Sequence, residues 1–146
     1  MFKQVLVTLD GSSLAEQALP KAVQVAESFG AELTLLRVVN PLLKSYRAGA
    51  AIVADIEQEE KYLLEEALNY LNDLAATIRE KDIVVNTITV LGRPYQEIVK
   101  YPEEKDIDLL VMSTRGETGL TRWLLGSVTD HVIRGVSVPV LVVPAQ

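Results

Sequence analysis

Short stretches that are almost continuously apolar alternate along the chain with longer segments whose apolar residues have helical spacing. The apolar stretches are 5–9, 33–39, 83–91, 107–112 and 138–143. Continuous apolar runs are typical of strands covered on both faces, as in a parallel sheet. The helical patterns lie at 14–29, 56–79, 94–99 and 127–134. This alternation predicts right-handed βαβ units and a doubly wound α/β sheet with helices on both faces.

Local signals predict where the helices begin and end. The serine pair 12–13 can cap the first helix, and Gly30 can end it in a left-handed conformation. Pro20 lies inside that helical pattern and predicts a kink or a shifted start, because proline removes one helical N–H group. By the same reasoning Pro102 predicts an early end to the helix that begins at 94.

The connection at 40–54 contains Pro41 and is long for a compact domain, which favours a mobile lid or a disordered loop. The helix predicted at 56–79 then carries a single apolar stripe on an otherwise charged surface, and we expect the stripe to cover one face of the sheet. Its residues are Leu64, Leu68, Leu71, Ala75 and Ile78.

Composition narrows the class of protein. With 146 residues, 49% of them apolar, the chain fits one domain spanning 1–146 that buries a core without metal or disulfide. There is no cysteine, and no stretch resembles a signal peptide or a membrane span, so a cytoplasmic location is expected. A net charge of −6 without a basic run argues against nucleic acid as a partner.

Candidate chemistry gathers at the carboxyl ends of two predicted strands, where open sheets of this class bind ligands. Asp10 follows the first strand, and the glycine-bearing segment 113–119 follows the fourth. That segment leads to a helix that opens at Ser127. Small residues let the backbone approach phosphate oxygens, and a helix start directs free N–H groups at them. The pattern indicates an anion site, which in so acidic a chain would rely on backbone donors and a divalent cation.

At this point the sequence resembles the universal stress proteins over essentially its whole length. The matching segments are 5–12, 92–94, 106–112 and 138–143. The ATP-binding branch of that family carries Gly, two residues, Gly, nine residues, then Gly followed by Ser or Thr. Here Ser113, Gly116 and the pair Gly126-Ser127 stand at those positions, so Ser113 replaces the first glycine. The resemblance implies a Rossmann-like fold with five strands in the order 3-2-1-4-5.

The resemblance also implies a site for ATP or another adenine nucleotide, with Mg held through the phosphates and no protein side chain as a direct metal ligand. Base and ribose would lie near Asp10, Val38, Met112 and Ser113. Phosphates would be held by N–H groups of Gly116, Gly126, Ser127 and Val128, and by the Ser127 hydroxyl. From its position in the loop, Arg115 is a further candidate for a phosphate contact.

The last strand is expected at an edge of the sheet, because Pro139 cannot donate to a ladder. An apolar edge strand invites pairing with a second copy of the chain. The family commonly dimerises through this strand, so the resemblance and the edge argument both predict a homodimer through Val138 to Val143.

Other interpretations stay open. Asp10 equally fits an acid at a helix cap, and the single histidine, His131, fits a structural role better than catalysis. The Ser113 replacement also fits a dimeric signalling or interaction module that binds no nucleotide. A slow ATPase is a third possibility, although the chain lacks a Walker loop, a G-x-G-x-x-G motif and a positioned general base.

Overall fold

A computed structural model of the chain describes residues 1–41, 53–114 and 125–146. Its strands form one sheet in the order β3-β2-β1-β4-β5, with every neighbouring pair parallel, which confirms the predicted fold class. The first three strands lie close to their predicted positions, as β1 (Gln4–Thr8), β2 (Glu32–Val39) and β3 (Val85–Leu91). The others are β4 (Leu109–Ser113) and β5 (Val140–Val143), and β5 lies at the edge as expected.

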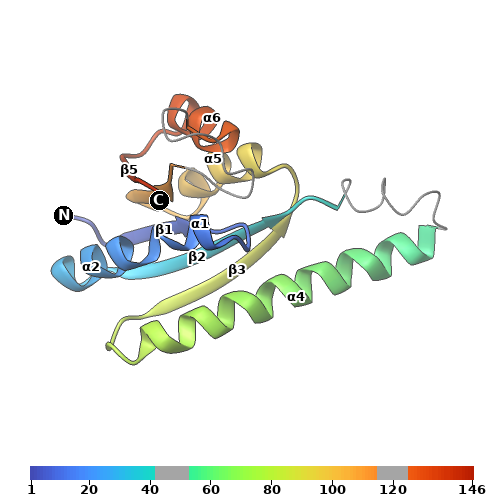
Figure 1. Cartoon of the computed structure of the whole chain (residues 1–146), viewed down its shortest axis with the longest axis horizontal. Coiled ribbons are helices and arrows are strands. Elements are labelled where there is room, and N and C mark those ends of the chain that lie inside the picture. Colours follow the sequence, from blue (N-terminus) through green and yellow to red (C-terminus); the bar gives the residue numbers. More distant parts are fainter. Residues whose placement is uncertain (42–52, 115–124) are drawn as a thin grey trace.

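Helices pack on both faces of this sheet (Figure 1). One face carries α1 (Ser13–Glu16), α2 (Leu19–Phe29) and the long α4 (Val53–Arg79). The other face carries α5 (Pro94–Glu104) and α6 (Ser127–Gly135). None of the helices in the described residues is long and apolar enough to cross a membrane.

The two prolines inside helical patterns have different effects. Pro20 does shift a helix start: α1 ends at Glu16, and α2 begins at Leu19 with Pro20 in its first turn, where no N–H partner is lost. The prediction for Pro102 was wrong, because α5 continues to Glu104. Pro102 lies in the last turn, its ring is buried, and its carbonyl accepts a hydrogen bond from Ile107 N at 3.1 Å.

The caps of the first helices follow the sequence signals. The Ser12 hydroxyl accepts a hydrogen bond from Ala15 N at 3.2 Å, and Gly30 ends α2 with φ 64°. The connection expected at 40–54 lies largely outside the described residues. Its far end is visible, since α4 begins at Val53, a few residues earlier than predicted.

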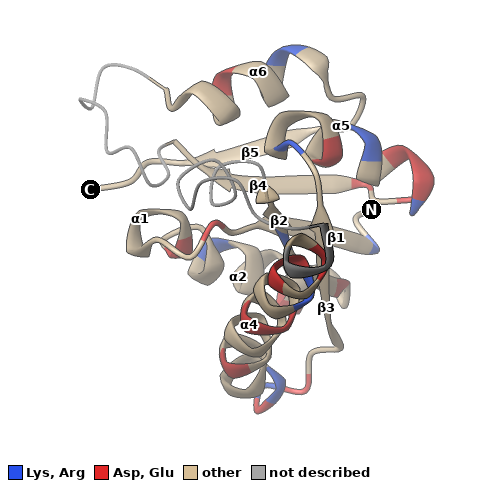
Figure 2. Cartoon of the chain, turned by 90° about the vertical axis from the view of Figure 1, so that its right-hand side faces the viewer, with Lys and Arg blue, Asp and Glu red and all other residues tan. Residues whose placement is uncertain are grey.

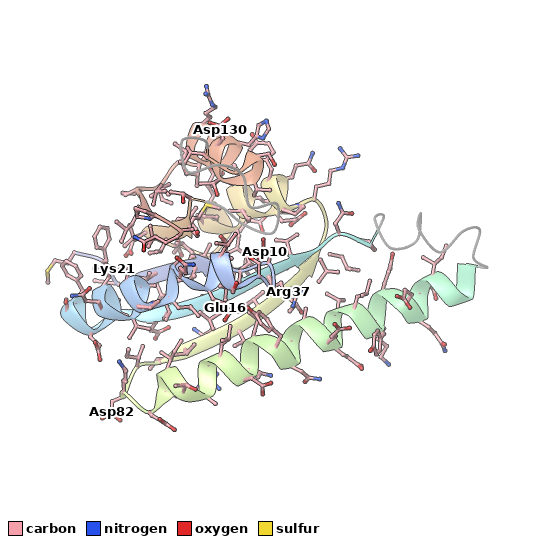
Figure 3. All side chains as sticks on the ribbon, viewed as in Figure 1. Asp10, Glu16, Lys21, Arg37, Asp82 and Asp130 are labelled. Atoms are coloured by element: carbon pink, nitrogen blue, oxygen red, sulfur yellow. The ribbon has the colours of Figure 1, made fainter. Side chains whose placement is uncertain are left out.

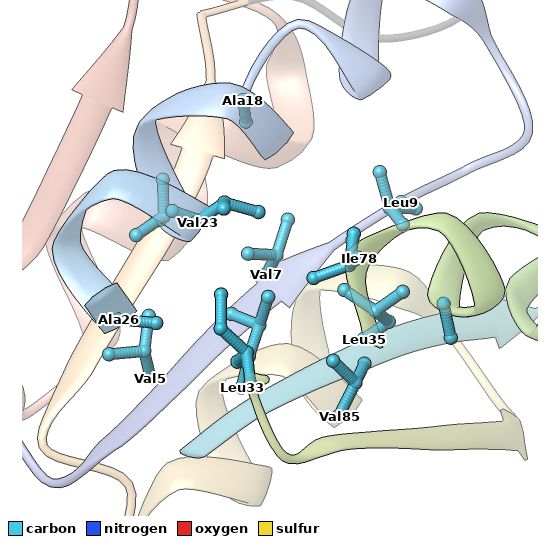
Figure 4. Packing of buried hydrophobic residues seen from close by; sticks show 14 of the residues in the cluster. Val5, Val7, Leu9, Ala18, Val23, Ala26, Leu33, Leu35, Ile78 and Val85 are labelled. Atoms are coloured by element: carbon cyan, nitrogen blue, oxygen red, sulfur yellow. The ribbon is translucent and has the colours of Figure 1, made fainter. Parts of the chain in front are cut away.

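The larger part of the core lies between the sheet and the α2/α4 layer (Figure 4). Val5, Val7, Leu33 and Leu35 project from β1 and β2 into this cluster and are fully buried. The face of α4 that packs on them is turned by about one residue from the predicted stripe, because Leu64 and Leu68 are only half-buried. The buried residues of α4 are Leu63, Ala67, Leu71, Ala75 and Ile78. Its outer side carries many acidic residues (Figure 2).

Candidate functional site

A cleft of about 200 Å³ opens at the carboxyl ends of β1, β2 and β4, beside the first residues of α5 and α6. It is the place at which the strand order reverses, between β1 and β4, and doubly wound sheets bind ligands there. The structure brings seven of the nine predicted site residues into its lining. They are Asp10, Val38, Met112, Ser113, Gly126, Ser127 and Val128. The other two, Arg115 and Gly116, lie outside the described residues.

The cleft also contains residues that sequence reasoning missed, namely Thr8, Leu9, Ala15, Leu36, Pro94, Ile98 and Thr129. The alternation of a strand could have found two of them, because the paired residues Thr8 and Leu36 stand two positions before Asp10 and Val38. Pro94 and Ile98 had no signal in the sequence, since they reach the cleft only through the packing of α5 on the sheet.

The start of α6 supplies backbone donors. The first hydrogen bond of the helix runs from Asp130 N to Gly126 O at 2.9 Å, so helix geometry leaves the amides of residues 127–129 without an intrahelical acceptor. Gly126, the N-cap residue, makes no side-chain cap hydrogen bond. Ser127 is exposed, so its hydroxyl is accessible beside these amides. Together they form a cluster of donors at the positive end of the helix dipole.

The observed role of Gly126 differs from the predicted one, in which its amide donates to a phosphate. Its N–H donates to Thr114 O at 2.8 Å, so this amide is already engaged within the protein. Its backbone angles, φ −58° and ψ 152°, lie in a region open to every residue. The structure therefore gives Gly126 the role of tying the start of α6 to the end of β4.

A second bond between the same elements comes from Thr129. Its side chain is buried, and its hydroxyl donates to Ser113 O at 3.0 Å. Ser113, at the end of β4, is itself 5% exposed. This bond fixes the distance between the cluster of donors on α6 and the strand that forms the floor of the cleft.

Asp10 organises the turn on the opposite wall. Its carboxylate Oδ1 accepts hydrogen bonds from Ser12 N at 2.9 Å and from Ser12 Oγ at 2.5 Å. Ser12 in turn caps α1. Asp10 therefore supports a helix cap and lines the cleft at the same time, so the two interpretations of this residue are compatible.

The remaining wall is apolar. Leu36, Ile98 and Met112 are buried, and Val38 is half-buried, so the cleft offers a flat ring a desolvated surface. Among the described lining residues Asp10 carries the only formal charge, and His131 is not one of them. His131 lies on the exposed side of α6, with Nδ1 at 2.8 Å from Ser127 O and its ring next to Tyr95.

The match to a family model decides the relationship of this chain to known proteins. The model describes the universal stress protein family and matches residues 1–144. The chain belongs to the universal stress protein family. Universal stress protein MJ0531 of Methanocaldococcus jannaschii is 35% identical over 143 residues, which cover 98% of this chain and 82% of the relative.

Solved structures of the family show the same fold. The structure of protein MJ0577 of Methanocaldococcus jannaschii superposes with a TM-score of 0.82 at 32% identity, covering 100% of this chain and 98% of that one. A universal stress protein solved in complex with cAMP superposes with a TM-score of 0.68 at 26% identity. That alignment covers 99% of this chain and 98% of the other protein.

Proposed function

We propose that this universal stress protein binds ATP, or another adenine nucleotide, in the cleft at the carboxyl ends of β1 and β4. The main observation in favour of this proposal is that the apolar wall and the backbone donors at the start of α6 border one cleft. The wall suits a purine ring, and the donors suit phosphate oxygens. The related protein solved with cAMP supports an adenine nucleotide as the class of ligand.

In this proposal the base and ribose lie against Val38, Met112 and Ser113, beside Asp10. The phosphates approach the amides of residues 127–129 and the Ser127 hydroxyl. Among the described residues no group of three or more acidic, histidine or cysteine side chains is arranged to hold a metal ion. A Mg²⁺ ion would therefore arrive with the phosphates it neutralises, which would offset the net charge of −6.

The function proposed is regulatory binding. Asp10 is the only carboxylate among the described lining residues, and Ser12 occupies its Oδ1 with two hydrogen bonds. A carboxylate held in this way is poorly placed to activate water. We expect any ATP hydrolysis to be slower than about 1 s⁻¹, an ordinary rate for an enzyme. A faster turnover would contradict a binding function.

Isothermal titration with Mg-ATP tests the proposal. Ser127→Ala removes one donor to a charged group, and we expect it to weaken binding about tenfold. Ser137→Ala is the matched control, since Ser137 is exposed and is not part of the cleft lining. No detectable binding by the unmodified protein at about 1 mM ligand, where Kd corresponds to about −4 kcal/mol, would refute the proposal.

Gly126→Asp provides a second test, because it places a carboxylate beside the phosphates. Saturating ATP should raise the thermal stability of the unmodified protein, by about 2.7 kcal/mol at a concentration of one hundred Kd. The variant should lose this increase. An equal increase in both proteins would place the nucleotide elsewhere. Mass spectrometry of protein purified under native conditions would show whether a nucleotide accompanies it.

A second candidate function, a dimeric interaction module, is favoured by the edge strand. β5 lies at the open edge of the sheet, and Leu141 on it is 37% exposed. We propose that two copies pair through Val138 to Val143. Light scattering should then report a dimer that Leu141→Asp dissociates. A protein that dimerises but binds no nucleotide would favour the interaction module over the nucleotide-binding function.

A further inference from the structure

Arg37 lies beside the turn that bears Asp10, on the α4 side of the sheet. Successive side chains of a strand point to opposite faces. Val38 borders the cleft, whereas Leu33 and Leu35 belong to the core under α4. By this alternation Arg37 projects toward α4. β2 thus lines the cleft with Leu36 and Val38 and reaches the α4 layer with Arg37, the residue between them.

The guanidinium of Arg37 packs closely against the turn after β1. A Cβ atom added to Gly11 would lie 2.9 Å from Arg37 Nη2 and 3.1 Å from Arg37 Cζ. Gly11 also has φ 89°, a conformation that side chains rarely adopt. Gly11 therefore permits the turn and also leaves room for the guanidinium, next to Asp10 in the sequence.

Arg37 also contacts the aromatic ring of Tyr70 on α4, with its Cζ atom 5.0 Å from the ring centroid. A planar guanidinium at this distance gains a cation–π attraction. Asp10, Glu16 and Arg37 are seen together between α1 and α4 in Figure 3. Arg37 is therefore a side-chain link between α4 and the turn that carries Asp10.

Tyr70 is itself held in place. Its hydroxyl donates to Glu16 Oε2, on α1, at 2.5 Å. Burial, and secondly the hydrogen bond to the Glu16 carboxylate, raise the pKa of Tyr70 above its ordinary value. The phenol therefore remains protonated, and remains a donor, throughout the neutral range. The ring that supports Arg37 is thus anchored to the helix that Ser12 caps.

We propose that Arg37 is a positioning residue of the nucleotide site, which holds the Asp10 wall of the cleft in place and is itself held by Tyr70 of α4. This inference rests on the proposed function. It assigns a specific role to α4, a helix with no residue in the described cleft lining. A substitution of Tyr70 on α4 would therefore alter nucleotide affinity through the guanidinium of Arg37.

The test compares two arginine variants by titration with Mg-ATP. Arg37→Gln should raise Kd about three- to tenfold, the range expected for loss of a cation–π contact and its packing. Arg79→Gln is the matched control. Arg79 Nη2 donates to Val85 O at 2.6 Å, where β3 begins, at the end of the sheet away from the cleft. It should change the melting temperature and leave Kd unchanged.

Two tyrosine variants distinguish a positioning effect on the Asp10 turn from a general loss of stability. Tyr70→Leu removes the ring and should weaken binding nearly as much as Arg37→Gln. Tyr70→Phe keeps the ring and loses only the hydrogen bond to Glu16, so its effect on Kd should be about twofold or less. In the ligand-free protein, Arg37→Gln and Tyr70→Leu should both shift the amide resonances of Gly11 and Ser12.

An Arg37→Gln protein that binds Mg-ATP as tightly as the unmodified protein would overturn the inference and leave the proposed function intact. Equal weakening by Arg79→Gln would also overturn it, because it would show a general effect of stability. Failure of the unmodified protein to bind any adenine nucleotide would instead refute the proposed function, and the positioning role with it.

Discussion

The two faces of the sheet differ in how completely they are covered. On the face under α2 and α4, Leu33, Leu35 and Leu71 are fully buried in one large cluster. On the face under α5 and α6 the fully buried set is smaller, and Val38 and Val90 are only partly covered. We call the side with the larger buried cluster the closed face, although a groove lies on it between α2 and α4. The side whose Leu36, Ile98 and Met112 line the cleft is called the open face. Because burial of apolar surface stabilises the fold, the larger cluster predicts that the closed face contributes more of the stability.

Helix length explains much of this difference. α4 has 27 residues and at 1.5 Å per residue runs for roughly 40 Å. It packs along β2 and β3 (Figure 1). α5 has 11 residues and α6 has 9, so each covers a far shorter length of sheet. The cleft opens where these two short helices begin.

The largest effect should follow a cavity on the closed face. Leu71→Ala removes a fully buried side chain from the α4 cluster, and we expect a loss of about 2–5 kcal/mol in the free energy of unfolding. Urea denaturation measures it. Val84→Ala, at a residue 57% exposed, should change stability by less than about 0.5 kcal/mol. If Leu71→Ala cost no more than this control, the closed face would not be the main source of stability.

A smaller loss is expected where the open face is tied together. Thr129→Val keeps the side-chain shape but removes the buried hydrogen bond from the Thr129 hydroxyl to Ser113 O, which should cost about 1–3 kcal/mol. It should also weaken Mg-ATP binding, since the start of α6 is no longer held to β4. Thr77→Val, at an exposed position on α4, is the control. If Thr129→Val bound Mg-ATP as tightly as the unmodified protein, the hydrogen bond between Thr129 and Ser113 would have no role in nucleotide binding.

The turn between the two faces should show an intermediate sensitivity. Ser12→Ala removes the cap of α1 and a partner of Asp10, and about 1 kcal/mol of stability should be lost. Ser28→Ala serves as control, because Ser28 is exposed and its hydroxyl donates only to the preceding turn of α2. Comparable losses in both variants would argue against a special role for the turn.

Alkaline pH provides a further comparison, since each face has, among the described residues, one tyrosine whose pKa is raised. Burial and Glu16 raise the pKa of Tyr70, and burial alone raises that of Tyr101. A raised folded-state pKa stabilises the protein below the unfolded value of about 10, and this contribution is lost as pH rises further. Stability measured from pH 9 upward should therefore fall less steeply in Tyr70→Phe. Tyr101→Phe should change the slope less, and the reverse order would be unexpected.

The smallest effect is expected on the outer surface of α6. Arg134 forms an exposed ion pair with Asp130 at 3.3 Å. Arg134→Gln should change stability by less than about 0.5 kcal/mol, and less again in high salt. Thermal melts at low and high ionic strength check this. A loss above about 1 kcal/mol would mean that this side of the open face contributes more than its exposure indicates.

Much of this architecture could be predicted from local features of the sequence. The apolar runs identified every strand of the sheet, Ser12 and Gly30 marked helix ends, and Pro20 marked a break between helices. These signals act over a few residues, through hydrogen bonds and backbone angles. Seven of the nine residues expected at the site line one cleft, because the ends of the strands and the start of α6 can be located along the chain.

Contacts between distant segments escaped prediction for a shared physical reason. Pro102 stays helical because its ring is buried, the Gly126 amide is engaged by Thr114, and Pro94 and Ile98 join the cleft through the packing of α5. The link from Tyr70 through Arg37 to Gly11 joins three elements far apart in the chain. The local sequence pattern indicates helix and strand propensity and periodicity. These contacts depend instead on the angle and distance at which each helix packs on the sheet. Side-chain packing throughout the fold sets both.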